Sequence, residues 1–152
     1  PMDFENLIVD AYATGHFLAL MKAGPGMASA VPFGPMGEQS RSISETLKNP
    51  EICEYHIITL PEELPLKEAI ELKSQLKNEF GVDSKIYLNK VLHMENIEFP
   101  KNPFGEYLRF QSQKINFARN YLKENDQAFQ EIPWVLEGAG SAIVNKVSEA
   151  LA

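Results

Sequence analysis

Apolar runs separated by turn-forming residues divide the chain into alternating strands and helices. The run at residues 4–9 (FENLIV) ends at Asp10 and predicts a buried strand. A turn around Gly15 follows, and the apolar stretch at residues 17–21 then predicts the start of a helix. Similar runs predict three further strands, at residues 55–60, 85–92 and 129–135.

Helical patterns lie between these strands, at residues 38–48, 62–80, 104–123 and 141–152, the last after the turn Gly138-Ala139-Gly140. Residues 23–37 (AGPGMASAVPFGPMG) are rich in glycine and proline, and they predict a loop. Strands that alternate with helices indicate an α/β fold with a mostly parallel sheet. We expect a single α/β domain over residues 1–152.

Composition and charge limit the partners and the cellular location that we expect for this protein. The formal net charge of -7, from 14 basic and 21 acidic residues, argues against a nucleic acid as partner. Cys53 is the only cysteine, so no internal disulfide forms and a cytoplasmic location is expected. The longest apolar runs fall well short of the roughly 18 residues that a membrane span needs, so no span is expected.

Ligands of parallel sheets bind beyond the carboxyl ends of the strands. That rule selects Asp10 to His16, Pro61 to Glu63, Asn89 and Pro133. Residue chemistry alone leaves their roles open. An aspartate after a buried strand can hold Mg²⁺, but it is more often a helix cap or turn residue, and an asparagine after a strand is often only a turn residue.

The string Asp10-Ala11-Tyr12-Ala13-Thr14-Gly15-His16 resembles the switch II motif of the ArsA-like P-loop ATPases, the arsenical-pump and tail-anchored-protein-targeting enzymes. It matches the form D-A-P-A-T-G-H at six of seven positions, with Tyr12 in place of proline. The likeness continues through Gly34-Pro35-Met36, residues 58–72 (ITLPEELPLKEAIEL) and Leu88-Asn89-Lys90-Val91. The chain thus resembles the C-terminal half of this family over essentially its whole length.

The resemblance implies a fold and a set of roles. The fold would be the C-terminal half of a P-loop NTPase, Rossmann-like with helices around a mostly parallel sheet. Asp10 would help to hold Mg²⁺ and its water shell, and Thr14, Gly15 and His16 would belong to the switch that senses the γ-phosphate of ATP. Asn89 would read the adenine edge, and Pro133 and its neighbours would pack against the base. ATP and Mg²⁺ are therefore the cofactors implied for the complete protein.

No G-x-x-x-x-G-K-[ST] motif occurs in the sequence, so we do not expect this chain to hydrolyse ATP alone. The expected partner is an N-terminal half that carries this phosphate-binding loop, and a homodimer is a further expectation because a missing half would leave apolar surface exposed. The alternative is a stand-alone, non-hydrolysing interaction or regulatory module with the ATPase fold. An unrelated doubly wound domain with another small ligand ranks last.

Three weaker features have simpler explanations. Glu62 and Glu63 could be paired catalytic carboxylates, but a helix N-terminus accounts for both acids. Cys53 and His56 have zinc-like spacing without a second pair of ligands. Phe33 and three methionines in and just before the glycine-rich segment could form an apolar lip for a partner, although packing within the domain is the more frequent role. These methionines are Met21, Met27 and Met36.

Overall fold

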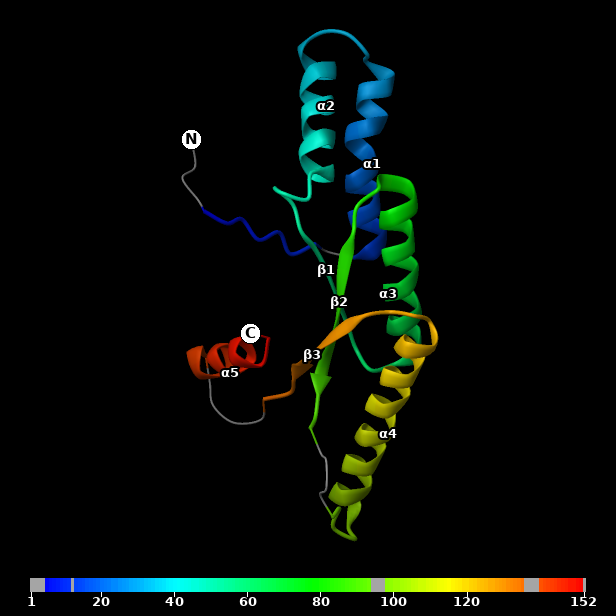
Figure 1. Cartoon of the computed structure of the whole chain (residues 1–152), viewed down its shortest axis with the longest axis vertical. Coiled ribbons are helices and arrows are strands. Elements are labelled where there is room, and N and C mark those ends of the chain that lie inside the picture. Colours follow the sequence, from blue (N-terminus) through cyan, green and yellow to red (C-terminus); the bar gives the residue numbers. More distant parts are fainter. Residues whose placement is uncertain (1–4, 12, 94–97, 136–139, 152) are drawn as a thin grey trace. The chain divides into compact units, whose positions relative to one another are not determined.

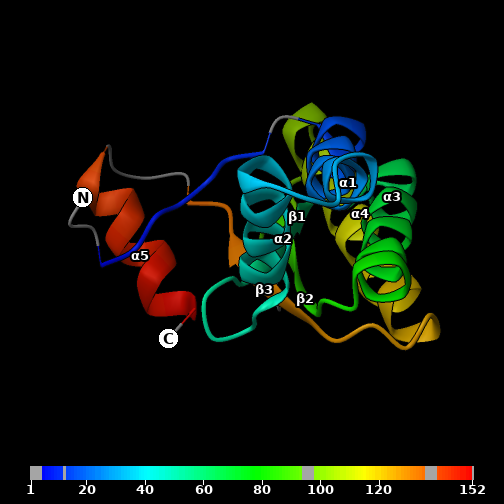
Figure 2. The ribbon, with the colours of Figure 1, turned by 90° about the horizontal axis from the view of Figure 1, so that it is seen from above.

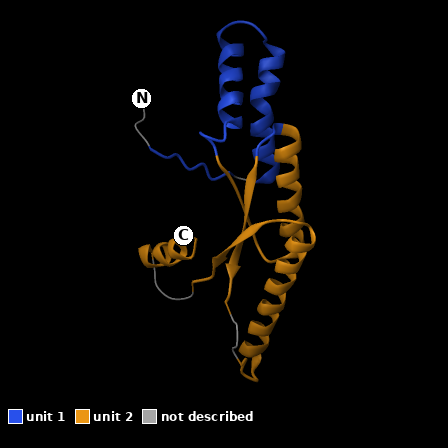
Figure 3. Ribbon diagram, viewed as in Figure 1, with its two compact units in different colours: residues 1–53, 80–82 blue, residues 54–79, 83–152 orange. Residues whose placement is uncertain are grey.

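The computed structural model describes residues 5–11, 13–93, 98–135 and 140–151. Expectations that involve Phe4, Tyr12, Ala152 or the Gly138-Ala139 part of the last turn lie outside these residues. The chain forms two compact units, which Figure 3 distinguishes by colour. Unit 1 comprises residues 1–53 and 80–82, and unit 2 comprises residues 54–79 and 83–152.

Unit 1 is built on a helical hairpin. Helix α1 (Thr14–Ala30) and helix α2 (Pro35–Lys48) lie side by side in both Figure 1 and Figure 2. They approach closely at Gly24, where a Cβ atom would lie 2.7 Å from the hydroxyl oxygen of Ser44. Arg41 of α2 donates a hydrogen bond from Nη1 to the carbonyl of Pro32 at 2.8 Å. Small residues between the helices and this bond to the connecting segment hold the hairpin together.

The prediction of a loop at residues 23–37 is wrong. Helix α1 continues through Ala30 with Pro25 inside it, and α2 begins at Pro35, so residues 31–34 alone connect the two helices. Glycine and proline disfavour an isolated helix, but packing against a second helix overrides such local preferences. Here the missing side chain of Gly24 is what allows α2 to come close.

The strand expected at residues 4–9 is also wrong over its described part. Residues 5–9 form no strand, and Leu7, Ile8 and Val9 are 78%, 92% and 70% exposed. A strand requires a neighbouring backbone that accepts and donates its hydrogen bonds. None of the described residues supplies one for this segment, so its apolar pattern does not produce a strand.

Unit 2 contains a parallel sheet of three strands, in the order β1-β2-β3. Strand β1 spans Tyr55–Thr59, β2 spans Ser84–Val91 and β3 spans Phe129–Pro133. All three were predicted from the sequence to within two residues at each end. The fold is therefore mixed α/β, with helices around a parallel sheet, and it is compatible with a Rossmann-like architecture.

Three helices accompany this sheet. Helix α3 (Glu63–Gln75) continues into a π-helical turn at Leu76–Phe80, and α4 (Pro103–Glu124) and α5 (Ser141–Leu151) complete unit 2. Figures 1 and 2 show α3 and α4 on one side of the sheet and α5 on the other, beside β3. Asn102 caps α4, since its side-chain oxygen accepts a hydrogen bond from the backbone N–H of Gly105 at 2.9 Å.

The core of unit 2 lies between the sheet and the helices α3 and α4. Its fully buried side chains come from both layers: Leu66, Leu76, Ile86, Leu88, Val91, Ile115 and Leu122. The strands alternate, so that Ile57 and Thr59 of β1 are buried while Ile58 between them is 62% exposed. The sheet therefore has one well-covered face, which carries most of the hydrophobic stabilisation.

Two glycines of the hairpin give opposite expectations for replacement by alanine. Gly26 lies inside α1 with open space around it, so Gly26→Ala should raise the free energy of unfolding by about 0.5–1 kcal/mol. At Gly37 an added Cβ would collide with the carbonyl oxygen of Val31, so Gly37→Ala should lower the free energy of unfolding by about 1–3 kcal/mol. Urea unfolding followed by circular dichroism measures both. Equal effects of the two substitutions would contradict this packing of the hairpin.

Candidate functional site

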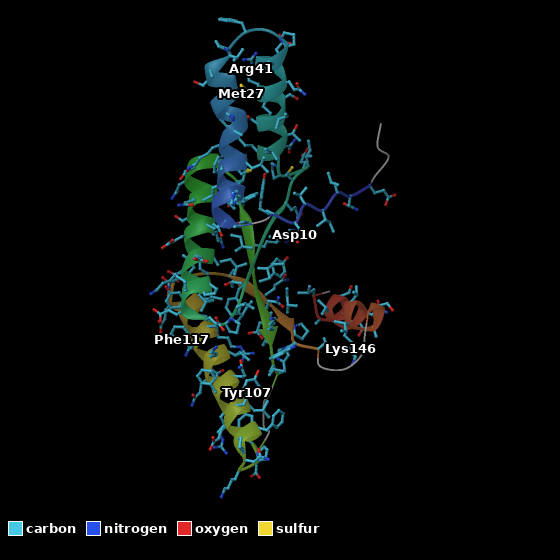
Figure 4. The ribbon with its side chains drawn as sticks, turned by 180° about the vertical axis from the view of Figure 1, so that it is seen from behind. Asp10, Met27, Arg41, Tyr107, Phe117 and Lys146 are labelled. Carbon is cyan, nitrogen blue, oxygen red and sulfur yellow. The ribbon has the colours of Figure 1, made fainter. Side chains whose placement is uncertain are left out.

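The switch-like residues lie at the entrance to α1 in unit 1. Asp10 is exposed in the segment that precedes the helix, as Figure 4 shows. Ala13 is extended, with φ -131° and ψ 154°, and its carbonyl accepts the first helical hydrogen bond from the N–H of Phe17 at 2.9 Å. Thr14, Gly15 and His16 therefore form the exposed first turn of α1.

This first turn offers hydrogen-bond donors to an anion. The leading backbone N–H groups of a helix have no partners within it, and they carry the positive end of the helix dipole. Ala13 provides no side-chain cap, and the turn contains no acidic residue. An alanine Cβ at Gly15 would meet nothing within 4 Å, so packing within the described structure does not require glycine there. The arrangement suits a phosphate group approaching the backbone.

A second group of residues gathers where β2 and β3 end in unit 2. The register shifts by one residue, because Leu88 pairs with Glu131 whereas Val91 pairs with Pro133. Asn89 and Lys90 thus stand together opposite Ile132 as a β-bulge, and Lys90 adopts a left-handed conformation with φ 58°. The side-chain oxygen of Asn89 accepts a hydrogen bond from the backbone N–H of Lys90 at 2.8 Å.

The structure thus places the expected site residues in two groups, one in each unit. It brings Asn89 and Pro133 to the carboxyl ends of neighbouring strands, as the ligand rule for parallel sheets requires. Asp10 and the Thr14 to His16 turn belong to unit 1. Asn89 lies within β2, two residues before its end, so the bulge and not a following loop determines its position.

An ion pair anchors the end of β3 to α4. Arg119 binds Glu131 with two bonds, Nε to Oε1 at 2.6 Å and Nη2 to Oε2 at 2.8 Å. Both side chains are about four-fifths buried. The guanidinium hydrogen bonds hold the pKa of Glu131 below its ordinary value of 4.5, although partial burial opposes this shift. The pair fixes β3 two residues before Pro133.

Glu62 and Glu63 line an open cleft of about 440 Å³ at the carboxyl end of β1. Its other lining residues are Pro61, Gln113, Lys114 and Phe117, the last of which Figure 4 marks on α4. Each acid has a cation beside it, Lys114 at 3.0 Å from Glu62 and Lys67 at 2.6 Å from Glu63. Two carboxylates that each form an ion pair with a separate lysine are poor candidates for paired acid and base catalysis.

His56 belongs to a network on the sheet and not to a cysteine-containing metal site. Its Nδ1 lies 3.2 Å from the hydroxyl of Tyr87, and its Nε2 lies 3.4 Å from a carboxylate oxygen of Glu54. Over the ranges that the structure describes, no cluster of three or more His, Cys, Asp or Glu side chains could hold a metal ion. A Mg²⁺ ion bound through phosphates and water needs only one or two protein carboxylates, so Asp10 remains a suitable ligand.

Sequence reasoning gave no role to Lys90, and it included Trp134 only as a neighbour of Pro133. Nothing in the pattern indicates a left-handed backbone at Lys90, because glycine or asparagine is the usual residue in that conformation. Trp134 follows Pro133, and its backbone N–H donates to the carbonyl of Val91 at 2.8 Å, which extends the pairing beyond the strand. A lone tryptophan at the end of a predicted strand was the available signal.

Comparison of the chain with protein-family models gave no match, and comparison with curated protein sequences gave none either. Among the described residues, no helix combines the length and the apolar character that a membrane crossing requires.

The Arg119–Glu131 pair predicts a stability that depends on pH. Because the folded pKa of Glu131 lies below its unfolded value, the pair contributes fully above about pH 4.5 and loses its contribution as the pH falls through the folded pKa. Glu131→Gln should lower the free energy of unfolding at pH 7 by about 1–2 kcal/mol and flatten its dependence on acid pH. Urea titrations at several pH values measure this. Glu62→Gln, in an exposed pair with Lys114, is the control that should change little.

Proposed function

We propose that this chain is the C-terminal portion of an ArsA-like, anion-transporting type of P-loop ATPase. It would contribute switch II and adenine-binding elements to the binding and hydrolysis of Mg-ATP. The observation that carries the proposal is the Asp10 to His16 string leading directly into the uncapped first turn of α1. Asn89 and Pro133 at one edge of the parallel sheet support it independently.

Separate groups of residues in this chain would contact the metal, the γ-phosphate and the base. Asp10 would orient the hydrated Mg²⁺, which neutralises charge on the phosphates when bound. The Thr14 to His16 turn would direct its backbone N–H groups to the γ-phosphate and move when that phosphate leaves. Asn89 and Pro133 would orient the base. The phosphate-binding loop and its lysine would come from the N-terminal half, because the sequence contains no such motif.

The decisive variant is Asp10→Asn, which removes a charge without changing the size of the side chain. ATP turnover is measured for the 152-residue chain and for the longest protein that its gene encodes. The longer protein alone should hydrolyse ATP, and Asp10→Asn should lower its turnover by about 10- to 100-fold because the metal loses an ionised ligand. A fluorescent ATP analogue reports binding separately.

Asp126→Asn is the matched control, because Asp126 is exposed in the turn after α4 and its positive φ of 53° suits asparagine equally well. It should leave turnover unchanged. If both proteins are inert and neither prefers ATP to GTP, the ATPase proposal fails. The chain is then better described as an interaction module with an ATPase fold.

The second candidate function, that of an interaction module, rests on the apolar surface of the hairpin. Leu20 of α1, Phe33 in the connection and Met36 at the start of α2 are 61%, 87% and 59% exposed. Met21 by contrast is buried, and Met27, which Figure 4 marks on α1, is 46% exposed. Such a group of exposed large side chains is typical of a protein-binding surface. In the ATPase proposal the same segment would pass motion to a partner.

This surface predicts self-association that depends on its exposed tip. The double substitution Phe33→Ser with Met36→Ser should raise the dissociation constant of the dimer at least tenfold, about 1.4 kcal/mol, because it removes two large exposed apolar side chains of the tip. Analytical ultracentrifugation measures the constant. Leu64→Ser, at a residue that is 66% exposed in α3, is the control. An equal effect of Leu64→Ser, or a wild-type chain that stays monomeric, contradicts the role of the hairpin.

A further inference from the structure

Helix α4 carries two apolar stripes, and only one of them faces the core of unit 2. Ile115, Ala118 and Leu122 follow each other at spacings of three and four residues, and all three are buried. A second stripe, which we call the aromatic seam, runs along another side of the helix with alternating spacings of three and four residues. Its members are Tyr107, Phe110, Lys114, Phe117 and Tyr121.

The aromatic seam is open along most of its length. Tyr107, Phe110 and Phe117 are 44%, 53% and 44% exposed, and Figure 4 marks the first and last of them on α4. Alternating spacings of three and four residues are the repeat of a coiled coil, in which each side chain packs into a hole formed by four residues of a second helix. A second helix is therefore the kind of element that the aromatic seam fits.

Contacts within unit 2 hold the middle of the aromatic seam in place. Nζ of Lys114 lies 5.0 Å from the centre of the Phe110 ring and 3.0 Å from Oε1 of Glu62. The ring of Phe117 stacks on the ring of Tyr121, with their centres 5.8 Å apart. Side chains that are ordered before binding lose less conformational entropy when a partner immobilises them.

The charge of Lys114 selects the direction of a second α4 helix. In a parallel pair in register, the two Lys114 ammonium groups would lie opposite each other, which is unfavourable for like charges. In an antiparallel pair, Lys114 lies on the ring of the partner's Phe117, and Phe110 lies on the ring of the partner's Tyr121. Each contact then occurs twice, as a two-fold axis requires. The cation gains an aromatic face and keeps its ion pair with Glu62.

The area of this antiparallel contact is sufficient for a weak dimer. A buried aromatic side chain covers about 150–250 Å², so the exposed parts of three seam rings amount to roughly 300 Å² in each copy. With Lys114, Tyr121 and the residues beside them, two copies would together bury on the order of 1,000 Å², which is the lower limit for a specific interface.

We propose that the aromatic seam binds the aromatic seam of a second copy of this chain, with the two α4 helices antiparallel. The aromatic seam belongs to unit 2 and the exposed tip of the hairpin belongs to unit 1, so the two surfaces act separately. The contact between the seams is the weaker association, which remains after the tip is substituted. It does not depend on the ATPase proposal.

Sedimentation equilibrium of the 152-residue chain with Phe33→Ser and Met36→Ser measures the aromatic seam alone. This hairpin-substituted chain should dimerise with a dissociation constant on the order of 100 μM, as expected for a small interface. Adding Phe110→Ser and Phe117→Ser should raise the constant at least tenfold, because the rings at the centre of the contact are lost. Circular dichroism checks that each variant is folded.

The matched control adds Phe104→Ser and Val144→Ser to the hairpin-substituted chain instead. Phe104 lies on α4 outside the aromatic seam and Val144 lies on α5, and the two side chains are 62% and 65% exposed. This control removes as many large exposed apolar side chains as the seam variant does. It should leave the dissociation constant unchanged.

Spin labels test the direction of the helices without changing the aromatic seam. A single cysteine is introduced as Glu106→Cys or as Gln113→Cys, two exposed positions seven residues apart on α4. The labelled protein is the hairpin-substituted chain with Cys53→Ser, because Cys53 is the only native cysteine. In the antiparallel pair the two labels at 106 should lie about 20 Å farther apart than the two labels at 113, since each copy contributes seven residues of helical rise.

Double electron–electron resonance measures both distances at a protein concentration several times the dissociation constant. A parallel pair gives the same distance at the two positions, and that result overturns the proposal. A hairpin-substituted chain that stays monomeric at ten times the expected dissociation constant overturns it as well, and so do equal effects of the seam variant and its matched control. ATP turnover enters none of these measurements, so the ATPase proposal is decided separately by Asp10→Asn.

Discussion

The parallel pairing of β2 with both of its neighbours is the interaction on which unit 2 depends. β2 contributes Ile86, Leu88 and Val91, all almost completely buried, and it is the only strand of the sheet with a partner on each side. Because the three strands run in the same direction, their carboxyl ends meet at one edge, where ligands of such sheets bind. The core and the candidate base site are therefore two consequences of one pairing pattern.

The elements of unit 2 could be predicted because each local pattern agrees with its final environment. The helix predicted at residues 62–80 corresponds to α3 and the π-helical turn after it, and the strand predicted at residues 55–60 corresponds to β1. Predictions failed in unit 1, where the outcome depends on neighbours. An apolar run at residues 5–9 is not a strand without a partner, and a segment with Gly24 and Pro25 is helical because a second helix packs against it.

The candidate site could be predicted only in part. The residues around Asp10 and Asn89 were selected by the rule for strand ends and by the resemblance of the switch-like string. The bulge could not be selected, because a lysine with a positive φ leaves no signal in the sequence. That bulge decides which side of the carboxamide of Asn89 is available, so residue identity alone did not define the chemistry of the site.

The bulge also places two polar side chains together at the edge of a sheet whose core is well packed. Regular alternation would place only one side chain opposite Ile132, whereas the extra residue puts both Asn89 and Lys90 there, on the face away from α4. A left-handed conformation at a residue with a side chain costs about 1–2 kcal/mol, and it persists only where surrounding pairing imposes it. The pairing of Val91 with Pro133 and the bond from Trp134 to Val91 provide that constraint immediately after the bulge. The strain is therefore confined to the position where Asn89 and Lys90 depart from the regular pairing of the strands.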